Sequence, residues 1–131
     1  MKIDHVGYLV KNIDKAAEAF LVLGYQSVSE RTHDEIREVD IEFFEKDGYV
    51  IELVSPYTKE SVVANLIKTY KNSPYHICYT VPNLEVAIEE LRGKGFVAID
   101  DPTPAPAFSN RKVCFLMHVR AGMIELLEEE K

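Results

Sequence analysis

The sequence predicts an α+β protein made of two tandem βαβββ modules, and two observations support this fold class. The first is an internal repeat, in which residues 4–28 align with residues 75–99 without a gap at a constant offset of 71. Seven of the 25 aligned pairs are identical, and the match resumes where residues 51–53 meet residues 124–126. The second is that both halves show the same order of local patterns. We therefore interpret the chain as an internal duplication.

The first half begins with residues 3–10, which alternate in the manner of a strand. Asn12 then suits the N-cap of a helix whose apolar stripe begins at Ile13, and Gly24 suits the left-handed residue that ends such a helix. Three more strands are expected at 25–30, 38–46 and 49–55. The turn at Lys46-Asp47-Gly48 is typical of a hairpin between the last two strands.

The second half repeats this order, with Asn83 as the cap and Gly95 after the helix. Its later strands are expected at 96–100, 112–119 and 122–128. Three prolines within 101–110 predict a stiff loop there, because proline interrupts helices and central strands.

An amphipathic segment between the halves predicts a connecting helix, since its apolar residues fall on one helical face. We expect one domain over residues 1–131. It would comprise a first module at 1–57, the connecting helix at 58–73 and a second module at 74–131.

The composition excludes several classes of protein. A net charge of −7 argues against a nucleic-acid surface, which would be basic. The sequence has no apolar run of the length needed to span a membrane, and its first residues lack the apolar core of a signal peptide. We expect a cytoplasmic protein in which Cys78 and Cys114, the only cysteines, are buried thiols. His33 lies in the polar run from Arg31 to Glu38 and His118 lies near a hairpin, so both are expected at the surface.

Each half supplies one histidine and one glutamate at matching places: His5 with Glu52, and His76 with Glu125. Taken singly, a strand histidine is more often a core residue, and a strand glutamate is more often solvated. However, each glutamate shares its strand face with aliphatic residues, where an unpaired carboxylate is costly. The symmetric recurrence therefore predicts one divalent metal site with four ligands, and Zn²⁺, Ni²⁺, Co²⁺, Mn²⁺ and Fe²⁺ all suit this ligand set.

Six short strings resemble the vicinal-oxygen-chelate superfamily of glyoxalases, bleomycin-resistance proteins and dioxygenases: Asp4-His5-Val6-Gly7, Asn12-Ile13-Asp14-Lys15-Ala16, Leu23-Gly24-Tyr25, Ile51-Glu52-Leu53, His76-Ile77 and Ile124-Glu125-Leu126. The resemblance covers almost the whole chain. It implies a curved, barrel-like mixed sheet with helices outside. It also implies one bound divalent ion, a homodimer, and a small-molecule substrate that is an acyl-CoA thioester or a glutathione hemithioacetal.

Two metal-dependent enzymes of this superfamily resemble the chain. The metal positions His5, Glu52, His76 and Glu125 follow the ligand order of glyoxalase I (lactoylglutathione lyase). Leu9 and Pro56, however, stand where that enzyme usually carries arginine and asparagine, and the pattern around Pro56 is similar to methylmalonyl-CoA epimerase. An epimerase is the leading interpretation and a glyoxalase I-type lyase is the alternative. A non-catalytic ligand-sequestering protein, as in bleomycin resistance, is the alternative from another class.

The resemblance also implies catalytic roles. Glu125 is expected to remove the proton next to a chelated carbonyl, with Glu52 as its partner on the opposite face. Glu35 is the other candidate for a second base. Arg111 and Lys112 are the candidates for meeting a phosphate or carboxylate of the substrate's carrier.

Overall fold

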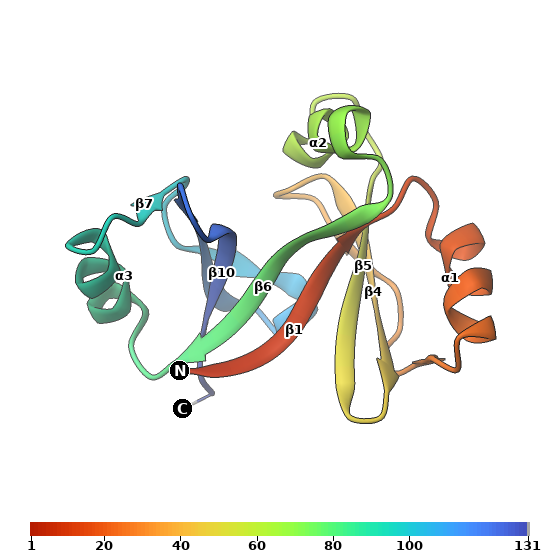
Figure 1. The fold of residues 1–131 in the computed structure, drawn as a ribbon, viewed down its shortest axis with the longest axis horizontal. Coiled ribbons are helices and arrows are strands. Elements are labelled where there is room, and N and C mark those ends of the chain that lie inside the picture. Colours follow the sequence, from red (N-terminus) through yellow and green to blue (C-terminus); the bar gives the residue numbers. More distant parts are fainter. Residues whose placement is uncertain (131) are drawn as a thin grey trace. The chain divides into compact units, whose positions relative to one another are not determined.

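A computed structural model describes residues 1–130, which form two compact units (Figure 1). One unit is His5–Tyr75, and the other begins at His76 and includes Met1–Asp4. Each unit carries a mixed sheet and the predicted βαβββ succession, so the α+β fold class is confirmed. Lys131, the last residue of the predicted second module, lies outside the described residues.

The sheet of the His5–Tyr75 unit has the strand order β2-β4-β5-β1, and β3 also pairs with β4. Strand β1 runs parallel to β5, whereas β4 is antiparallel to β2, β3 and β5. The strands are β1 (Lys2–Leu9), β2 (Gln26–Ser27), β3 (Thr32–Asp34), β4 (Val39–Lys46) and β5 (Tyr49–Pro56). The first residues of β1, up to Asp4, belong to the other unit.

Helix α1 (Ile13–Val22) covers one face of this sheet. It begins where predicted, because the Asn12 side chain accepts a hydrogen bond from the backbone N–H of Lys15 at 2.9 Å. Beyond its end, Gly24 has φ +101°, the left-handed conformation expected of it. The core between this helix and the sheet consists of Val10, Ile13, Phe44, Ile51 and Leu53.

We expect Phe44→Ala to destabilise the protein by about 3–5 kcal/mol, because it leaves a cavity in this core. Phe44 is 2% exposed, whereas Tyr49, which directly follows the turn of the same hairpin, is 76% exposed. Tyr49→Ala is therefore the matched control and should change the free energy of unfolding by less than about 0.5 kcal/mol. Urea titration followed by circular dichroism measures both. Equal losses in the two variants would contradict this packing.

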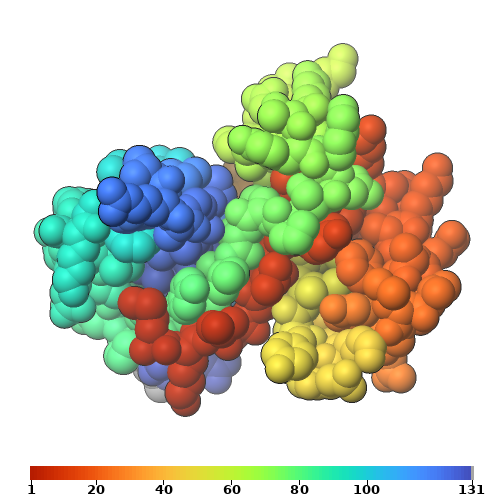
Figure 2. Space-filling model, in the orientation of Figure 1, coloured from red at the N-terminus to blue at the C-terminus, as the bar shows by residue number. Residues whose placement is uncertain are grey.

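The hairpin between β4 and β5 is confirmed as a two-residue turn. Lys46 pairs with Tyr49, and both central residues are left-handed, with φ 54° for Asp47 and 84° for Gly48. These values suit the type I′ turn that a twisted hairpin prefers. In Figure 2 this hairpin is the yellow segment, which reaches the molecular surface.

Helix α2 (Val62–Tyr70) lies within the predicted connecting segment. The Ser61 hydroxyl accepts a hydrogen bond from the N–H of Val63 and donates one to the carbonyl of Arg37. The Thr58 hydroxyl donates to the Glu38 carboxylate at 2.8 Å. These bonds fasten the turn between β3 and β4 to the start of α2.

The second unit repeats the arrangement with the strand order β6-β10-β9-β7, and β8 also pairs with β9. Asn83 caps helix α3 (Leu84–Arg92) by accepting a hydrogen bond from the N–H of Val86 at 3.1 Å. The helix packs on a core that includes Leu116, Ile124 and Leu126. The strands are β6 (Ser73–Val81), β7 (Val97–Ala98), β8 (Thr103–Ala105), β9 (Arg111–His118) and β10 (Gly122–Glu128).

The proline-rich segment is more ordered than the predicted loop. It contains strand β8 and a short 3₁₀ helix, Pro106–Phe108. Pro104 lies opposite Lys112 of β9, and among residues 1–130 β8 pairs with no other strand. An edge strand tolerates proline because the missing N–H breaks no ladder on its outer side.

Among residues 1–130, no helix has both the length and the apolar character required to cross a membrane.

Candidate functional site

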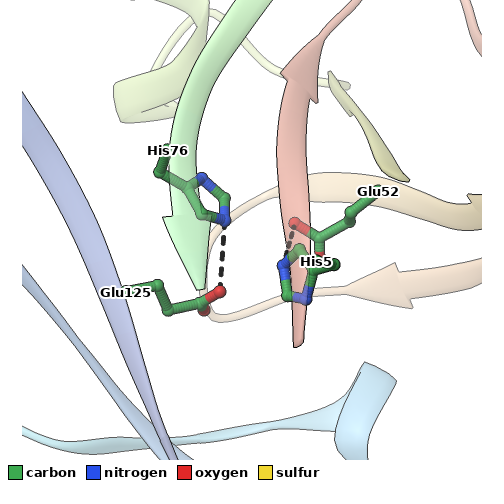
Figure 3. A group of neighbouring side chains, drawn as sticks. All are labelled: His5, Glu52, His76 and Glu125. Atoms are coloured by element: carbon green, nitrogen blue, oxygen red, sulfur yellow. Dashed lines mark ion pairs between the residues drawn. The ribbon is translucent and has the colours of Figure 1, made fainter. Parts of the chain in front are cut away.

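In the His5–Tyr75 unit, strands β1 and β5 bring His5 and Glu52 together. Gly7 lies opposite Glu52 in the parallel register, so His5 and Glu52 face the same side of the sheet. Nε2 of His5 lies 3.5 Å from Oε1 of Glu52. Both residues are buried, with exposed fractions of 1% and 3%. Figure 3 shows the two side chains pointing toward each other.

The second unit forms the equivalent pair from β6 and β10. Nε2 of His76 lies 3.2 Å from Oε1 of Glu125, as the dashed line in Figure 3 marks. Each residue is 4% exposed. Cys78, two residues beyond His76, lies opposite Glu125 in the register. Thus the duplication of the sequence is also a duplication of this pair.

Each pair has the chemistry and spacing of two ligands of one metal ion. A buried carboxylate is costly unless it is paired or bound to a cation. Two ligand atoms that lie about 2.0–2.2 Å from one ion, at tetrahedral or octahedral angles, are roughly 3.0–3.5 Å apart. The observed separations of 3.5 Å and 3.2 Å match that range. Imidazole and carboxylate ligands together suit a divalent transition metal.

A phenylalanine supports each histidine, a feature that the sequence analysis missed. Phe43 lies opposite Glu52, and Phe115 lies opposite Glu125. The ring of Phe43 meets that of His5 edge-on, with centroids 5.5 Å apart and planes at 78°. Phe115 meets His76 in the same way, at 5.1 Å and 87°. The recurrence of an aromatic residue at the same place in both hairpins was the signal that could have revealed them.

The other predicted second base, Glu35, lies exposed in the turn between β3 and β4. The buried acid of that region is its neighbour Asp34, which is 1% exposed. Asp34 accepts hydrogen bonds from the backbone N–H and from the guanidinium of Arg37, at 3.0 and 2.9 Å. Glu35 therefore sits in a solvated turn, unlike the buried sheet position of Glu52.

Arg111 and Lys112, the predicted carrier contacts, border a hollow of about 590 Å³. The guanidinium of Arg111 donates to the backbone carbonyls of Phe108 and Glu128. The lining of the hollow is acidic, because it also includes Glu85, Glu128, Glu129 and Glu130. These carboxylates would repel a phosphate from this end of the second unit.

His33 is exposed as predicted, whereas His118 is only partly so. Nδ1 of His33 lies 2.7 Å from the Asp40 carboxylate, and its ring stacks on Tyr57. His118 is half-buried, with its ring 4.6 Å from that of Phe96. The prediction for His118 missed the packing of the hairpin end against the residues that follow α3.

Cys78 and Cys114 are buried thiols, as predicted. Burial, with a smaller contribution from Asp100, raises the pKa of Cys114 to about 12. Because the pKa is raised, the thiol stays protonated and unreactive throughout the range from pH 6 to 9. We expect iodoacetamide to leave Cys114 unmodified in the native protein and to label it in urea, as measured by mass spectrometry of peptides. Rapid labelling of Cys114 at pH 8 without denaturant would contradict this environment.

Comparisons with known proteins agree with the architecture. A model of the glyoxalase/bleomycin resistance protein/dioxygenase superfamily matches residues 4–115. The mitochondrial methylmalonyl-CoA epimerase of Dictyostelium discoideum is 27% identical over 132 residues, which cover 98% of this chain and 78% of that protein.

Two solved structures are similar over almost the whole chain. The crystal structure of a hypothetical protein from Bacillus halodurans is 26% identical, with a TM-score of 0.87, covering 99% of this chain and 95% of that one. The methylmalonyl-CoA epimerase of Mycobacterium tuberculosis is 23% identical, with a TM-score of 0.83, covering 99% and 89%. At this identity the second likeness concerns the fold alone.

Proposed function

Because the chain belongs to the glyoxalase/bleomycin resistance protein/dioxygenase superfamily, we propose that it is a metal-dependent epimerase acting on a methylmalonyl-CoA-like thioester. The observation that carries this proposal is the buried histidine–glutamate pair present in each unit. The similarity to methylmalonyl-CoA epimerase over 98% of the chain supports the substrate class.

In this proposal His5, Glu52, His76 and Glu125 together hold one divalent ion. Each pair already has a separation suited to two ligands of an ion. The native metal is one of Zn²⁺, Ni²⁺, Co²⁺, Mn²⁺ and Fe²⁺. When bound, such an ion stabilises negative charge that develops on a carbonyl oxygen of the substrate.

The residues of the chain then carry the proton transfers. The Glu125 carboxylate takes the proton from the carbon between the thioester carbonyl and the neighbouring carboxyl group. Glu52, which begins this turnover protonated and displaced from the ion, delivers its proton to the opposite face of that carbon, which inverts its configuration. Burial of both carboxylates keeps competing water away from the reacting carbon. In the next turnover the two residues exchange roles.

A single assay tests this function. The metal-loaded protein is incubated with methylmalonyl-CoA in D₂O, and deuterium at the α-carbon is followed by mass spectrometry or NMR. We expect incorporation together with loss of optical activity. The absence of any exchange in a protein that contains one divalent ion per chain would refute the epimerase.

Glu52 favours a second candidate, a glyoxalase I-type lyase, because glutamate at this ligand position is typical of that enzyme. The same protein would then convert the hemithioacetal of methylglyoxal and glutathione. Turnover of that substrate without exchange on methylmalonyl-CoA would replace the epimerase with the lyase. A protein that retains no divalent ion would instead indicate the non-catalytic, ligand-sequestering class.

A further inference from the structure

The second unit has an exposed apolar row beside Glu125. Val97 lies opposite Met117, and Met117 lies opposite Met123, so the three side chains share one face of the sheet. Glu125 is two residues, or about 7 Å, from Met123 along β10 and therefore lies on this face. Val97 is 65% exposed and Met117 is 40% exposed.

Successive side chains along a strand point to opposite faces of the sheet, which explains why this row does not belong to the core. The residues between its members, such as Ala98, Leu116 and Ile124, point to the other face and pack beneath α3. The apolar row is therefore in excess of what the second unit needs to fold. Exposed apolar patches beside a polar site are typical of ligand-binding surfaces.

The duplication provides an internal comparison. In the first unit, His5–Tyr75, the row at the equivalent position consists of Gln26, Glu45 and Val50. Gln26 lies opposite Glu45, and Glu45 lies opposite Val50. Gln26 and Glu45 replace Val97 and Met117, yet the sheet has the same strand order. Since the fold accepts polar residues there, the apolar row of the second unit reflects a requirement other than folding.

Two exposed basic residues also lie at the end of the second unit nearest this row. Lys94 and Arg120 are both exposed, in the segment after α3 and in the turn between β9 and β10. The two segments are adjacent, because a Cβ atom placed on Gly95 would lie 3.1 Å from Nε2 of His118. In the first unit Leu23 stands at the position of Lys94 in the repeat, and the corresponding turn carries Asp47.

From these features we infer that the row Val97–Met117–Met123 holds the carrier arm of the thioester, with Lys94 and Arg120 meeting its phosphates. This inference rests on the proposed function, because it assumes that the thioester carbonyl lies at Glu125. The apolar row suits the aliphatic part of a pantetheine arm, and the basic pair is complementary to a nucleotide diphosphate. The carrier thus extends toward Lys94, away from the acidic hollow beside Lys112.

The test exchanges the two rows between the units. The double variant V97Q/M117E gives the second unit the polar residues of the first. We expect its KM for methylmalonyl-CoA to rise about tenfold with kcat unchanged, the scale of a lost apolar contact in a binding pocket. The KM for the N-acetylcysteamine thioester of methylmalonate, which lacks most of the arm, should not change. The reverse exchange, Q26V/E45M, is the matched control and should leave both KM values unchanged.

The basic pair is tested with K94E and R120E against K112E as the matched control. We expect the first two to weaken binding of coenzyme A about tenfold, the scale of one hydrogen bond between charged groups. Isothermal titration calorimetry measures this affinity without any reaction. K112E should bind as the wild type does. Weakening by K112E alone would overturn the inference and move the carrier to the acidic hollow.

The outcomes separate this inference from the proposed function. Wild-type protein that binds coenzyme A through this row, but exchanges no α-proton, refutes the epimerase and keeps the carrier site. Wild-type protein that exchanges the proton, with unchanged KM in V97Q/M117E and unchanged affinity in K94E and R120E, refutes the carrier site and keeps the epimerase.

Discussion

Replacing Glu125 by glutamine is expected to lower the rate of α-proton exchange about 10²- to 10⁴-fold for the enantiomer whose α-proton faces Glu125, the usual contribution of a general base. Glutamine has nearly the same shape as glutamate but cannot accept the proton. Because Glu125 is only 4% exposed, the substitution exchanges one buried polar group for another and should preserve the fold. Deuterium incorporation into methylmalonyl-CoA measures the loss, and circular dichroism checks the structure.

Glu52→Gln distinguishes a two-base mechanism from a one-base mechanism. If Glu52 serves the opposite face of the carbon, this variant should still exchange the proton of one enantiomer while losing epimerisation. Glu125→Gln should show the opposite enantiomer preference. Glu90→Gln, on the exposed side of α3, is the control and should behave as the wild type. Identical losses for both enantiomers in both active-site variants would contradict the assignment of one carboxylate to each face.

Much of the fold could be predicted because the duplication doubled each local signal. The Asn12 and Asn83 caps, the left-handed Gly24 and the Asp47-Gly48 turn are local features, and each lies where the pattern placed it. Their conformations depend on neighbouring residues in the chain, which the sequence displays directly.

The missed elements depend on contacts between distant residues. Strands β3 and β8 are only three residues long, and each is defined by pairing with β4 or β9. A proline in β8 even argues against a strand until its edge position is known. The phenylalanines that support the histidines were overlooked for the same reason, because cross-strand register decides which residue lies opposite Glu52 or Glu125.

The candidate site, like the fold, has features that could be predicted from the sequence and features that depend on contacts between distant residues. Residue types and repeat positions were enough to select His5, Glu52, His76 and Glu125 as a set. The charged residues that surround each candidate side chain in the fold, however, could not be predicted from the sequence. Lys112 looks like a phosphate contact in the sequence, but the acidic residues that share its hollow come from α3 and the last residues of the described chain. Because these acidic residues surround Lys112, we place the proposed carrier site at the opposite end of this unit.

If the protein binds the proposed metal ion, removing that ion is expected to destabilise the protein strongly, because the carboxylates of Glu52 and Glu125 would stay buried without a cation. At an ion concentration a thousand times the Kd, binding contributes about 4 kcal/mol to stability. For a chain of 131 residues this corresponds to roughly 10–15 °C in Tm. Differential scanning calorimetry before and after dialysis against a chelator measures the change, and re-addition of the metal should restore the original Tm.

Substituting the histidines one at a time decides whether the two pairs share an ion. If His5, Glu52, His76 and Glu125 hold one ion, then His5→Ala and His76→Ala should each weaken binding of that ion by at least about 100-fold, since even outer-shell changes cost 10- to 100-fold. The stoichiometry of the wild type should be one ion per chain. If the pairs instead act separately, each variant would lose one of two ions and keep the other at full affinity. Elemental analysis with competitive titration distinguishes these results, and His33→Ala, which removes an exposed imidazole, is the control. Two ions per wild-type chain would contradict the shared site, and with it the proton transfers to opposite faces of one substrate carbon.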